Sequence, residues 1–214
     1  MTYSVKEIYY TLQGEGAQTG RPAVFLRFSG CNLWSGREMH RLESVCRFCD
    51  TDFVGTDGAG GGKFETPELL ANAVLQAWPS TPGQQRPYVV CTGGEPLLQL
   101  DDAAVEALHA VGFEIGVESN GTLVAPAGID WLCISPKGSA GLVQASGNEL
   151  KLVYPQVETE AQPEKFAGLD FEHFFLQPLD SPDLEANTQR SIAYCLAHPQ
   201  WKLSLQTHKI IGID

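Results

Sequence analysis

Residues 23–30 read Ala-Val-Phe-Leu-Arg-Phe-Ser-Gly and predict a buried strand that ends at Gly30. A short apolar run closed by a glycine is typical of a strand covered on both faces of a sheet. Arg27 interrupts the run, and Cys31 follows directly after it. The carboxyl ends of such strands are where α/β folds build their sites. This stretch therefore indicates both a fold class and the place to look for a site.

Further strands are expected on both sides of this one, because short apolar runs recur along the chain between turn signals. They cover residues 4–10, 87–91, 113–118, 131–135, 150–154, 173–177 and 202–206. The connections between them are long enough for helices or extended loops. Strands that alternate with helices favour parallel pairing.

Three helices are expected among these strands. One begins at Pro67 after the N-cap Thr66, one is capped by Asp101, and one ends before Pro199. Their apolar side chains at helical spacing are expected to face the core; they are Leu69, Leu70, Val74, Leu75, Val105, Leu108, Val111, Ile192, Cys195 and Leu196.

The chain has 214 residues, whereas a complete barrel of eight parallel strands typically needs about 250. Residues 31–63 contain few apolar side chains and are expected to form a long functional loop. We therefore expect an α/β fold with an incomplete, TIM-like barrel and a mainly parallel sheet. A long cluster-binding loop would follow the first barrel strand, and residues 1–214 would form a single domain.

Charge and composition argue against several classes of function. The chain carries 26 acidic and 14 basic side chains, a formal net charge of −12. It therefore offers little to the phosphates of nucleic acid or to an anionic membrane surface. No run approaches the roughly 18 apolar residues of a membrane span, and the first residues do not resemble a secretory signal. We expect a cytoplasmic protein with reduced cysteines.

Three of the six cysteines crowd into the long loop. Cys31, Cys46 and Cys49 have the spacing C-x14-C-x2-C, and thiolates are soft ligands suited to zinc or to iron–sulfur clusters. A structural zinc site takes four protein ligands, for which His40 is the rival candidate in this loop. Three thiolates instead leave one iron of a four-iron cluster open to another ligand. A cysteine trio without metal is the remaining interpretation.

Two further features are better explained by structure than by a site. Residues 58–63 are rich in glycine, but their glycine spacing and the Phe64 that follows do not match a phosphate-binding loop. The cysteines outside the loop lie in apolar runs and are expected to pack in the core; they are Cys91, Cys133 and Cys195.

A second candidate site is the stretch Thr92-Gly93-Gly94-Glu95-Pro96, which ends the next buried strand. Glycines let a ligand approach the backbone closely, and Glu95 can accept hydrogen bonds from an ammonium group. Glycine pairs are common in turns, so the stretch alone is a weak signal. Its position beside the cysteine loop makes it more specific.

The cysteine triad after one strand and Gly-Gly-Glu-Pro after the next resemble the radical S-adenosylmethionine enzymes. Phe48 stands before the third cysteine, where that superfamily usually has an aromatic residue, although the gap between Cys31 and Cys46 is unusually long. From about residue 3 to its last residue, the chain is similar to the 7-carboxy-7-deazaguanine synthase family. The segments that match are 10–16, 27–33, 49–51, 92–96, 118–122, 135–137, 176–178 and 205–209.

This resemblance implies a lyase reaction and its cofactors. The reaction contracts 6-carboxy-5,6,7,8-tetrahydropterin to 7-carboxy-7-deazaguanine with loss of ammonia, on the route to queuosine. The implied cofactors are a 4Fe-4S cluster, S-adenosyl-L-methionine and Mg2+, and the implied assembly is a homodimer.

The resemblance also assigns residues to each ligand. The cluster would be held by Cys31, Cys46 and Cys49, and Mg2+ by Thr51. The residues implied for S-adenosylmethionine are Phe48, Cys49, Asp50, Gly94, Glu95, Ser135, Pro136, Lys137 and Gln177. Those implied for the pterin are Leu12, Gln13, Gly14, Glu15, Arg27, Thr92 and Asp214. Arg27 suits the pterin carboxylate, because the planar guanidinium matches a carboxylate in two hydrogen bonds.

Several candidates also have structural interpretations. Arg27 on a strand suits an ion pair, and Glu15 suits a turn. His208 is equally well explained as a core histidine, and Glu118 as a buried partner of Lys137.

Positive charge gathers in the cysteine loop of this otherwise acidic chain, at Arg37, His40, Arg41 and Arg47. We hypothesise that the loop docks an acidic, flavodoxin-type reductant, although nearby glutamates make a solvated face an equal interpretation. Two other functions stay open at this point. One is a glycyl-radical enzyme activase, and the other is a non-catalytic, metal-bearing interaction module.

Overall fold

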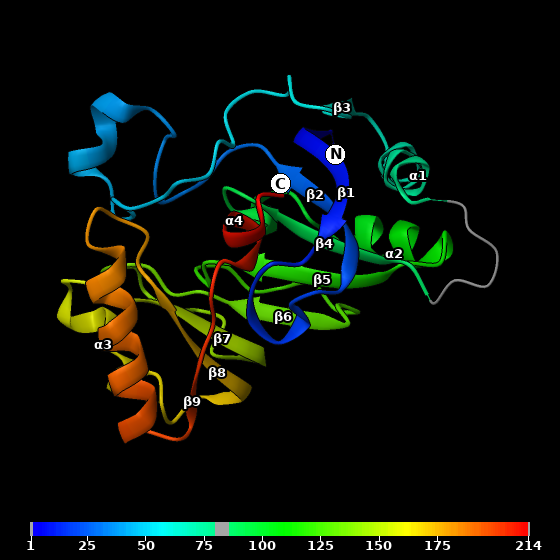
Figure 1. The fold of residues 1–214 in the computed structure, drawn as a ribbon. Coiled ribbons are helices and arrows are strands. Elements are labelled where there is room, and N and C mark those ends of the chain that lie inside the picture. Colours follow the sequence, from blue (N-terminus) through cyan, green and yellow to red (C-terminus); the bar gives the residue numbers. More distant parts are fainter. Residues whose placement is uncertain (1, 80–85, 214) are drawn as a thin grey trace.

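The structure is a computed structural model that describes residues 2–79 and 86–213. Nine strands in these residues form one sheet in the order β3-β1-β2-β4-β5-β6-β7-β8-β9 (Figure 1). Their bounds are β1 Tyr3–Leu12, β2 Pro22–Phe28, β3 Gly62–Phe64, β4 Tyr88–Gly93, β5 Glu114–Ser119, β6 Trp131–Ile134, β7 Ser146–Tyr154, β8 Asp170–Pro178 and β9 Trp201–Leu203. Every strand expected from the sequence is present, and β3 is additional.

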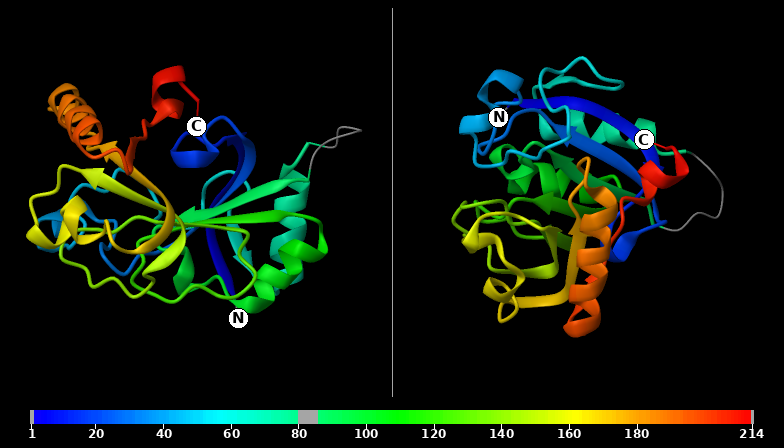
Figure 2. Two further views of the ribbon diagram at one scale, coloured as in Figure 1. Left: turned by 90° about the horizontal axis from the view of Figure 1, so that it is seen from below. Right: turned by 60° about the vertical axis from the view of Figure 1, so that its left-hand side comes forward.

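The sheet is mainly parallel and open. From β2 through β4 to β9, each strand pairs in parallel with the next one along the chain. β1 pairs antiparallel with both β2 and β3. Among the described residues no pairing joins β3 to β9, so the sheet does not close (Figure 2). The expected incomplete barrel is confirmed.

Helices cover the outer face of the sheet. α1 (Pro67–Ala77) and α2 (Asp102–Ala110) pack together near β1 and β5, and α3 (Leu184–Ala197) packs on β8 and β9. Strand side chains alternate between the two faces, as the pleat requires. Leu26 of β2 enters the core under the helices, whereas its neighbours Phe25 and Arg27 point to the inner face. The inner face is therefore free to build a site.

The predicted helix starts are confirmed, because the side chains of Thr66 and Asp101 accept backbone N–H hydrogen bonds at the first turns of α1 and α2. Two predicted core faces are confirmed at Leu70, Val74 and Cys195 and wrong at the other leucines named for them. On α1 the buried residues are Leu70, Ala71 and Val74, and the helix is rotated so that Leu69 and Leu75 are exposed. On α3 the exposed residue is Leu196, while Cys195 packs on the core.

The other core cysteines are buried, as expected, but in different surroundings. Cys91 packs in the apolar core under the helices. Cys133 points to the inner face, where its sulfur lies 3.5 Å from an oxygen of Glu149. Among the described residues, no helix has the length and apolar character that crossing a membrane would need.

The end of the chain differs from the expected strand over residues 202–206. β9 ends at Leu203, and a short helix, α4 (Thr207–Ile211), follows. The backbone N–H of Thr207 donates to the carbonyl of Gly14 at 2.9 Å, and its hydroxyl donates to the same oxygen at 2.8 Å. The C-terminal segment is thus held against the turn after β1, across the open side of the barrel.

Candidate active site

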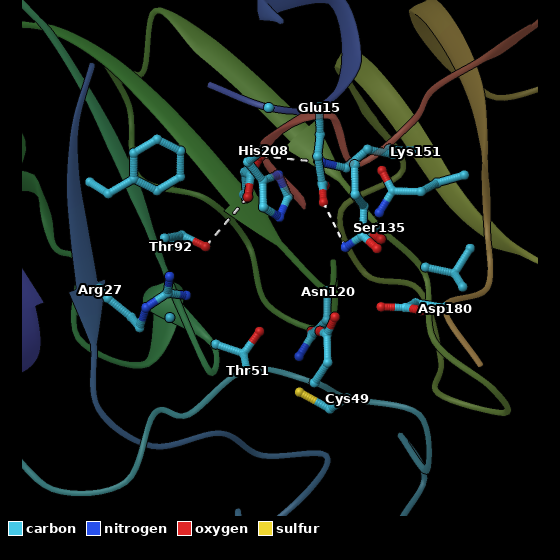
Figure 3. A pocket seen from close by; sticks show the side chains of 18 of the residues that line it. Glu15, Arg27, Cys49, Thr51, Thr92, Asn120, Ser135, Lys151, Asp180 and His208 are labelled. Carbon is cyan, nitrogen blue, oxygen red and sulfur yellow. Dashed lines mark hydrogen bonds and ion pairs between the residues drawn. The ribbon is translucent and has the colours of Figure 1, made fainter. Parts of the chain in front are cut away.

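A cavity of about 350 Å³ lies on the inner face where the parallel strands end (Figure 3). Most of the residues predicted from the sequence line it: Leu12, Gln13, Gly14, Glu15, Arg27, Cys46, Phe48, Cys49, Asp50, Thr51, Thr92, Gly94, Ser135, Lys137 and Gln177. Candidates for cluster, cofactor and substrate therefore share one cavity. Figure 3 shows Cys49 and Thr51 at one end and Glu15, Lys151 and His208 at the other.

Four predicted residues are not among those that line the cavity. Asp214 lies outside the described residues. Pro136 lies between the lining residues Ser135 and Lys137, Cys31 lies beside the lining residue Gly94, and the side chain of Glu95 is fully buried behind the wall. The structure therefore brings together most of the predicted site and withholds one carboxylate from it.

The cysteine loop folds around Arg41. Its Nη1 donates to the carbonyls of Arg47 and Cys49 at 3.0 and 2.9 Å, and its guanidinium lies 4.1 Å from the centre of the Trp34 ring. Trp34 in turn meets the buried ring of Phe53 edge-on. A segment poor in apolar residues thus acquires a small core of its own, which fixes the backbone that carries Cys46 and Cys49.

The three cysteines influence one another's pKa values. The thiol of Cys46 hydrogen-bonds to Cys49 and lowers the pKa of Cys49 to about 6, although burial opposes this. Burial raises the pKa of the Cys31 thiol, and the nearby Cys49 raises it as well. A thiolate is the form that ligates metal.

No set of three His, Cys, Asp or Glu side chains among the described residues has the geometry to hold a single metal ion. In a cubane, each thiolate binds its own iron, so the three sulfurs need not converge on one point. Cys46 and Cys49 line one end of the cavity and Cys31 lies beside Gly94 of its wall, so the three thiols form a donor set that fits an iron–sulfur cluster.

The Gly93-Gly94 pair brings the end of β4 against the backbone after β2. A Cβ atom at Gly94 would lie only 2.1 Å from the carbonyl oxygen of Gly30, and Gly93 has φ +138°. The two glycines are therefore required by the close approach of two chain segments. Both still line the cavity, where their backbone is accessible to a ligand.

Glu95 is buried among hydrogen-bond donors of the protein. Its Oε1 accepts hydrogen bonds from the Leu97 N–H and the Ser119 hydroxyl, and its Oε2 accepts one from the Asn120 N–H, all at 2.7–3.0 Å. These three donors hold the carboxylate in place within the protein, and its contact with an ammonium group stays a prediction. Burial raises the pKa of Glu95, against these hydrogen bonds. The carboxylate joins the ends of β4 and β5 instead.

Two residues at the end of β6 form one wall. Lys137 Nζ donates to the carbonyl oxygen of Ser135 at 2.9 Å and also contacts its hydroxyl. Asn120, which sequence reasoning did not single out, lines the cavity and donates to Asn32 Oδ1 at 3.0 Å. Asn120 thereby links the wall to the residue after Cys31.

Arg27 makes an ion pair and also lines the cavity. Its Nε donates to Glu7 at 2.7 Å and its Nη2 to the Tyr9 hydroxyl at 2.9 Å, so it is an ion-paired residue. Its side chain is only 17% exposed and lines the cavity. The Glu7 contact fixes one edge of the guanidinium and leaves donors on the other side for an anion.

Charged residues meet at the far end of the cavity. Lys151, on the inner face of β7, lies 2.6 Å from a Glu15 oxygen and 3.2 Å from a Glu118 oxygen. The expected pairing of Glu118 with Lys137 is therefore wrong, because Lys151 lies between Glu118 and Glu15. Burial disfavours the charged form of Glu15, but the Lys151 ammonium outweighs it and lowers the pKa of Glu15 to about 2.

The C-terminal segment supplies lining residues that sequence reasoning missed or left ambiguous. Gln206, His208 and Lys209 all line the cavity, so His208 is not a core histidine. Lys209 Nζ lies 2.5 Å from a carboxylate oxygen of both Asp50 and Asp180. These ion pairs join α4 to the cysteine loop through Asp50 and to the segment after β8 through Asp180.

Known proteins resemble this chain over its full length. No protein-family model matches it. The 7-carboxy-7-deazaguanine synthases of Caulobacter vibrioides and Bordetella pertussis are 66% and 62% identical to it over 213 residues, with complete coverage of both chains in each case. The crystal structure of QueE from Escherichia coli matches with a TM-score of 0.72 at 30% identity, covering 97% of this chain and 95% of that one. The chain therefore belongs to the 7-carboxy-7-deazaguanine synthase family.

Proposed function

We propose that the cavity binds S-adenosylmethionine and 6-carboxytetrahydropterin together for the family's lyase reaction in queuosine biosynthesis. That reaction yields 7-carboxy-7-deazaguanine with loss of ammonia. The observation that carries the proposal is the single cavity, which cysteine-loop residues border at one end and the Gln13–Glu15 turn at the other. A cluster, a cofactor and a flat substrate could then meet in one enclosed space.

Cys31, Cys46 and Cys49 would hold the 4Fe-4S cluster. When bound, the cluster and S-adenosylmethionine supply one-electron chemistry, the reductive cleavage of a sulfonium and removal of a hydrogen atom from the substrate. The protein's own part is to keep the loop folded through Arg41 and to surround the reacting groups with cavity walls.

The residues proposed for S-adenosylmethionine surround the end of the cavity nearest the cysteines. The accessible backbone at Gly94 suits its amino-acid part, and Ser135, Lys137 and Gln177 offer polar groups to its carboxylate and ribose. Phe48 and Asp50 flank the same space. Glu95 and Pro136 would act behind this wall, Glu95 by fixing the ends of two strands.

The proposed pterin site uses the inner face of β1 and β2. Arg27 would bind the carboxylate with the donors that Glu7 leaves free. Leu12, Gln13 and Gly14 would contact the ring, with Glu15 and Thr92 beside them. Asp214 stays a predicted substrate residue.

The Mg2+ part of the proposal rests on Thr51, which lines the cavity two residues after Cys49. A hydroxyl oxygen is a hard ligand of the kind Mg2+ accepts, together with substrate oxygens and water. We expect chelation of divalent cations to stop product formation. Replacing Thr51 with valine should raise the half-saturating Mg2+ concentration by about tenfold or more, because the cation loses a protein ligand.

The measurement is anaerobic turnover in a Mg2+ titration. Thr188→Val is the matched control, since the Thr188 hydroxyl donates to Leu184 on α3, outside the cavity. Unchanged rates in excess chelator would contradict the Mg2+ assignment.

We also propose that the chain is one domain, that it acts as a cytoplasmic homodimer, and that a flavodoxin-type protein reduces it. The reducing compartment suits thiolate ligands. Arg37 and Arg47 are exposed on the cysteine loop, where they could steer an acidic partner. Arg41 is unsuited to testing this, because it holds the loop together.

Reversing Arg37 and Arg47 to glutamate should slow flavodoxin-driven turnover by roughly tenfold at low salt, because charge steering speeds association. Dithionite-driven turnover should be unchanged. The control is the same double reversal at Lys165 and Arg190, which are exposed and lie outside the cysteine loop in the sequence. An equal effect with both reductants would show that the loop, not docking, had been damaged.

A further inference from the structure

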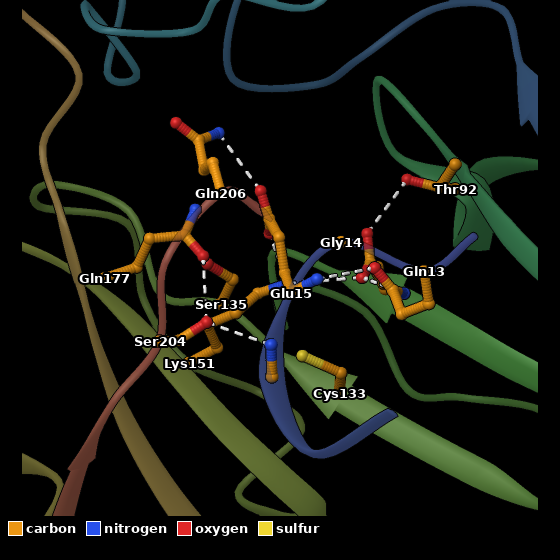
Figure 4. A network of polar contacts seen from close by, with 12 residues as sticks. Gln13, Gly14, Glu15, Thr92, Cys133, Ser135, Lys151, Gln177, Ser204 and Gln206 are labelled. Atoms are coloured by element: carbon orange, nitrogen blue, oxygen red, sulfur yellow. Dashed lines mark hydrogen bonds and ion pairs between the residues drawn. The ribbon is translucent and has the colours of Figure 1, made fainter. Parts of the chain in front are cut away.

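Lys151 is a nearly buried lysine at the floor of the cavity to which the proposed function gives no role. Its side chain is 6% exposed, and it projects from β7 between two carboxylates that come from other elements. Figure 4 shows Lys151 beside Glu15, with Gln13 and Gln206 around them. A lysine buried at this depth is rare unless it is paired.

Hydrogen bonds fix the carboxylates of Glu15 and Glu118 at the turn that follows β1. Glu15 accepts from Lys151 with one oxygen and from Gln206 Nε2 with the other, at 3.0 Å. Glu118 Oε1 accepts from Lys151 and from Gln13 Nε2 at 3.0 Å. Within the described part of the chain, its second oxygen, Oε2, has one long contact of 3.4 Å, with Thr92, so it retains acceptor capacity on the cavity side.

We propose that Lys151 is a positioning residue, which lies between the carboxylates of Glu15 and Glu118 and offsets their charge, so that the cavity floor accepts hydrogen bonds from the N–H groups of a flat heterocycle. This inference rests on the proposed pterin site. It assigns the lysine no contact with the reacting atoms.

The charged groups around Lys151 at the floor of the cavity support this role. Glu15 from the turn and Glu118 from β5 face the lysine directly, and Glu149 lies beneath them on β7 with Cys133 of β6. His208 of α4 also acts on Glu15. Burial raises the pKa of Glu149, whereas Lys151 holds the pKa of Glu15 low. Lys151 is the lysine that offsets this group of carboxylates.

Loss of the lysine has a definite chemical consequence. Two neighbouring carboxylates without a cation between them repel, and one binds a proton. A protonated carboxyl group donates a hydrogen bond where the substrate's N–H needs an acceptor. Substrate binding then weakens as the pH falls, over a range in which wild-type Glu15 stays ionised.

The test measures binding, not turnover. The probe is oxidised pterin-6-carboxylate, whose fluorescence reports its dissociation constant between about pH 5 and pH 8. For Lys151→Met we expect affinity to fall up to about tenfold per pH unit on the acidic side, relative to wild type, because binding is linked to loss of one proton. Comparison with wild type removes any contribution of His208, which both proteins contain.

Three variants complete the design. Lys151→Arg keeps the charge and should restore the wild-type pH profile, whereas a merely space-filling role would not require a cation. Lys202→Met is the matched control, because Lys202 is exposed on β9. If Lys151→Met does not fold, the double variant Glu15→Gln/Lys151→Met removes the repulsion between Glu15 and Glu118; it should fold, and its affinity should fall by clearly less than about tenfold per pH unit on the acidic side.

The inference would be overturned if Lys151→Met bound the probe with the wild-type pH profile. It would also be overturned if the double variant lost affinity at acidic pH as steeply as Lys151→Met is expected to. Wild-type turnover of the carboxypterin is measured in parallel. Normal wild-type turnover with the wrong variant profile rejects only the role of Lys151, whereas wild-type protein that neither binds nor converts the pterin rejects the proposed function.

Discussion

Replacing Cys31, Cys46 or Cys49 individually with serine is expected to abolish product formation and to lower bound iron after anaerobic reconstitution. The serine hydroxyl is a harder and far less acidic ligand than a thiol, so it does not replace the thiolate at iron. Because the bound cluster supplies the difficult step, no protein side chain can compensate for its loss. Iron content, the visible spectrum and product formation measure the effect.

Cys195→Ser is the matched control for these variants, because Cys195 is half-buried on α3 and lies outside the cavity. It should keep wild-type iron content and turnover. A serine variant of the triad that retained both a full cluster and activity would contradict the ligand assignment for that cysteine.

Replacing Arg27 with methionine is expected to raise KM for the carboxypterin strongly. The yield of folded protein should change little. Losing one partner of a buried, charged hydrogen-bonded pair costs about 2–5 kcal/mol, or roughly 30- to 5,000-fold in affinity. Arg27→Lys keeps the charge and loses the planar fork, so its KM should lie between those of wild type and Arg27→Met. Steady-state kinetics and equilibrium binding measure the change.

A substrate analogue separates recognition of the carboxylate from structural damage. A pterin without the 6-carboxylate should bind to wild type much more weakly than the carboxypterin does, and Arg27→Met should bind both almost equally. Arg21→Met is the control, because Arg21 makes a comparable two-hydrogen-bond pair with Glu114 away from the cavity. If Arg27→Met still favoured the carboxylated ligand, another residue would have to bind the carboxylate.

The parts of the fold and site that were predictable follow from local signals. The apolar run of β2, the cap at Asp101 and the close pair Cys46 and Cys49 are each set by neighbours in the sequence. Parallel strands place their carboxyl ends at one edge, so residues that follow them could be expected to converge. The resemblance to a known family then assigned most of the residues that line the cavity.

The parts that could not be predicted depend on partners distant in the sequence. Lys151 lies in an apolar strand, and its two carboxylate partners are 136 and 33 residues away. The donors that bind Glu95 come partly from β5, and nothing in its own motif reveals them. Helix α4 has only five residues and no side-chain cap, and its contacts with Gly14 hold it in place.

The rotation of α1 has a similar origin. Leu69 and Leu70 are adjacent and equally apolar, so periodicity alone does not say which of them faces inward. Packing against β1 and α2 buries Leu70 with Ala71 and Val74. A small residue such as Ala71 allows a close approach that a count of large apolar side chains overlooks.

The central claim is that one cavity converts the carboxypterin with a cluster and S-adenosylmethionine bound in it. The most direct measurement is the mass of the product formed when anaerobically reconstituted wild-type protein is incubated with 6-carboxytetrahydropterin, S-adenosylmethionine, Mg2+ and a reductant. We expect 7-carboxy-7-deazaguanine and an equal amount of ammonia. A protein that holds its iron and cleaves S-adenosylmethionine, yet leaves the pterin unchanged, would contradict it.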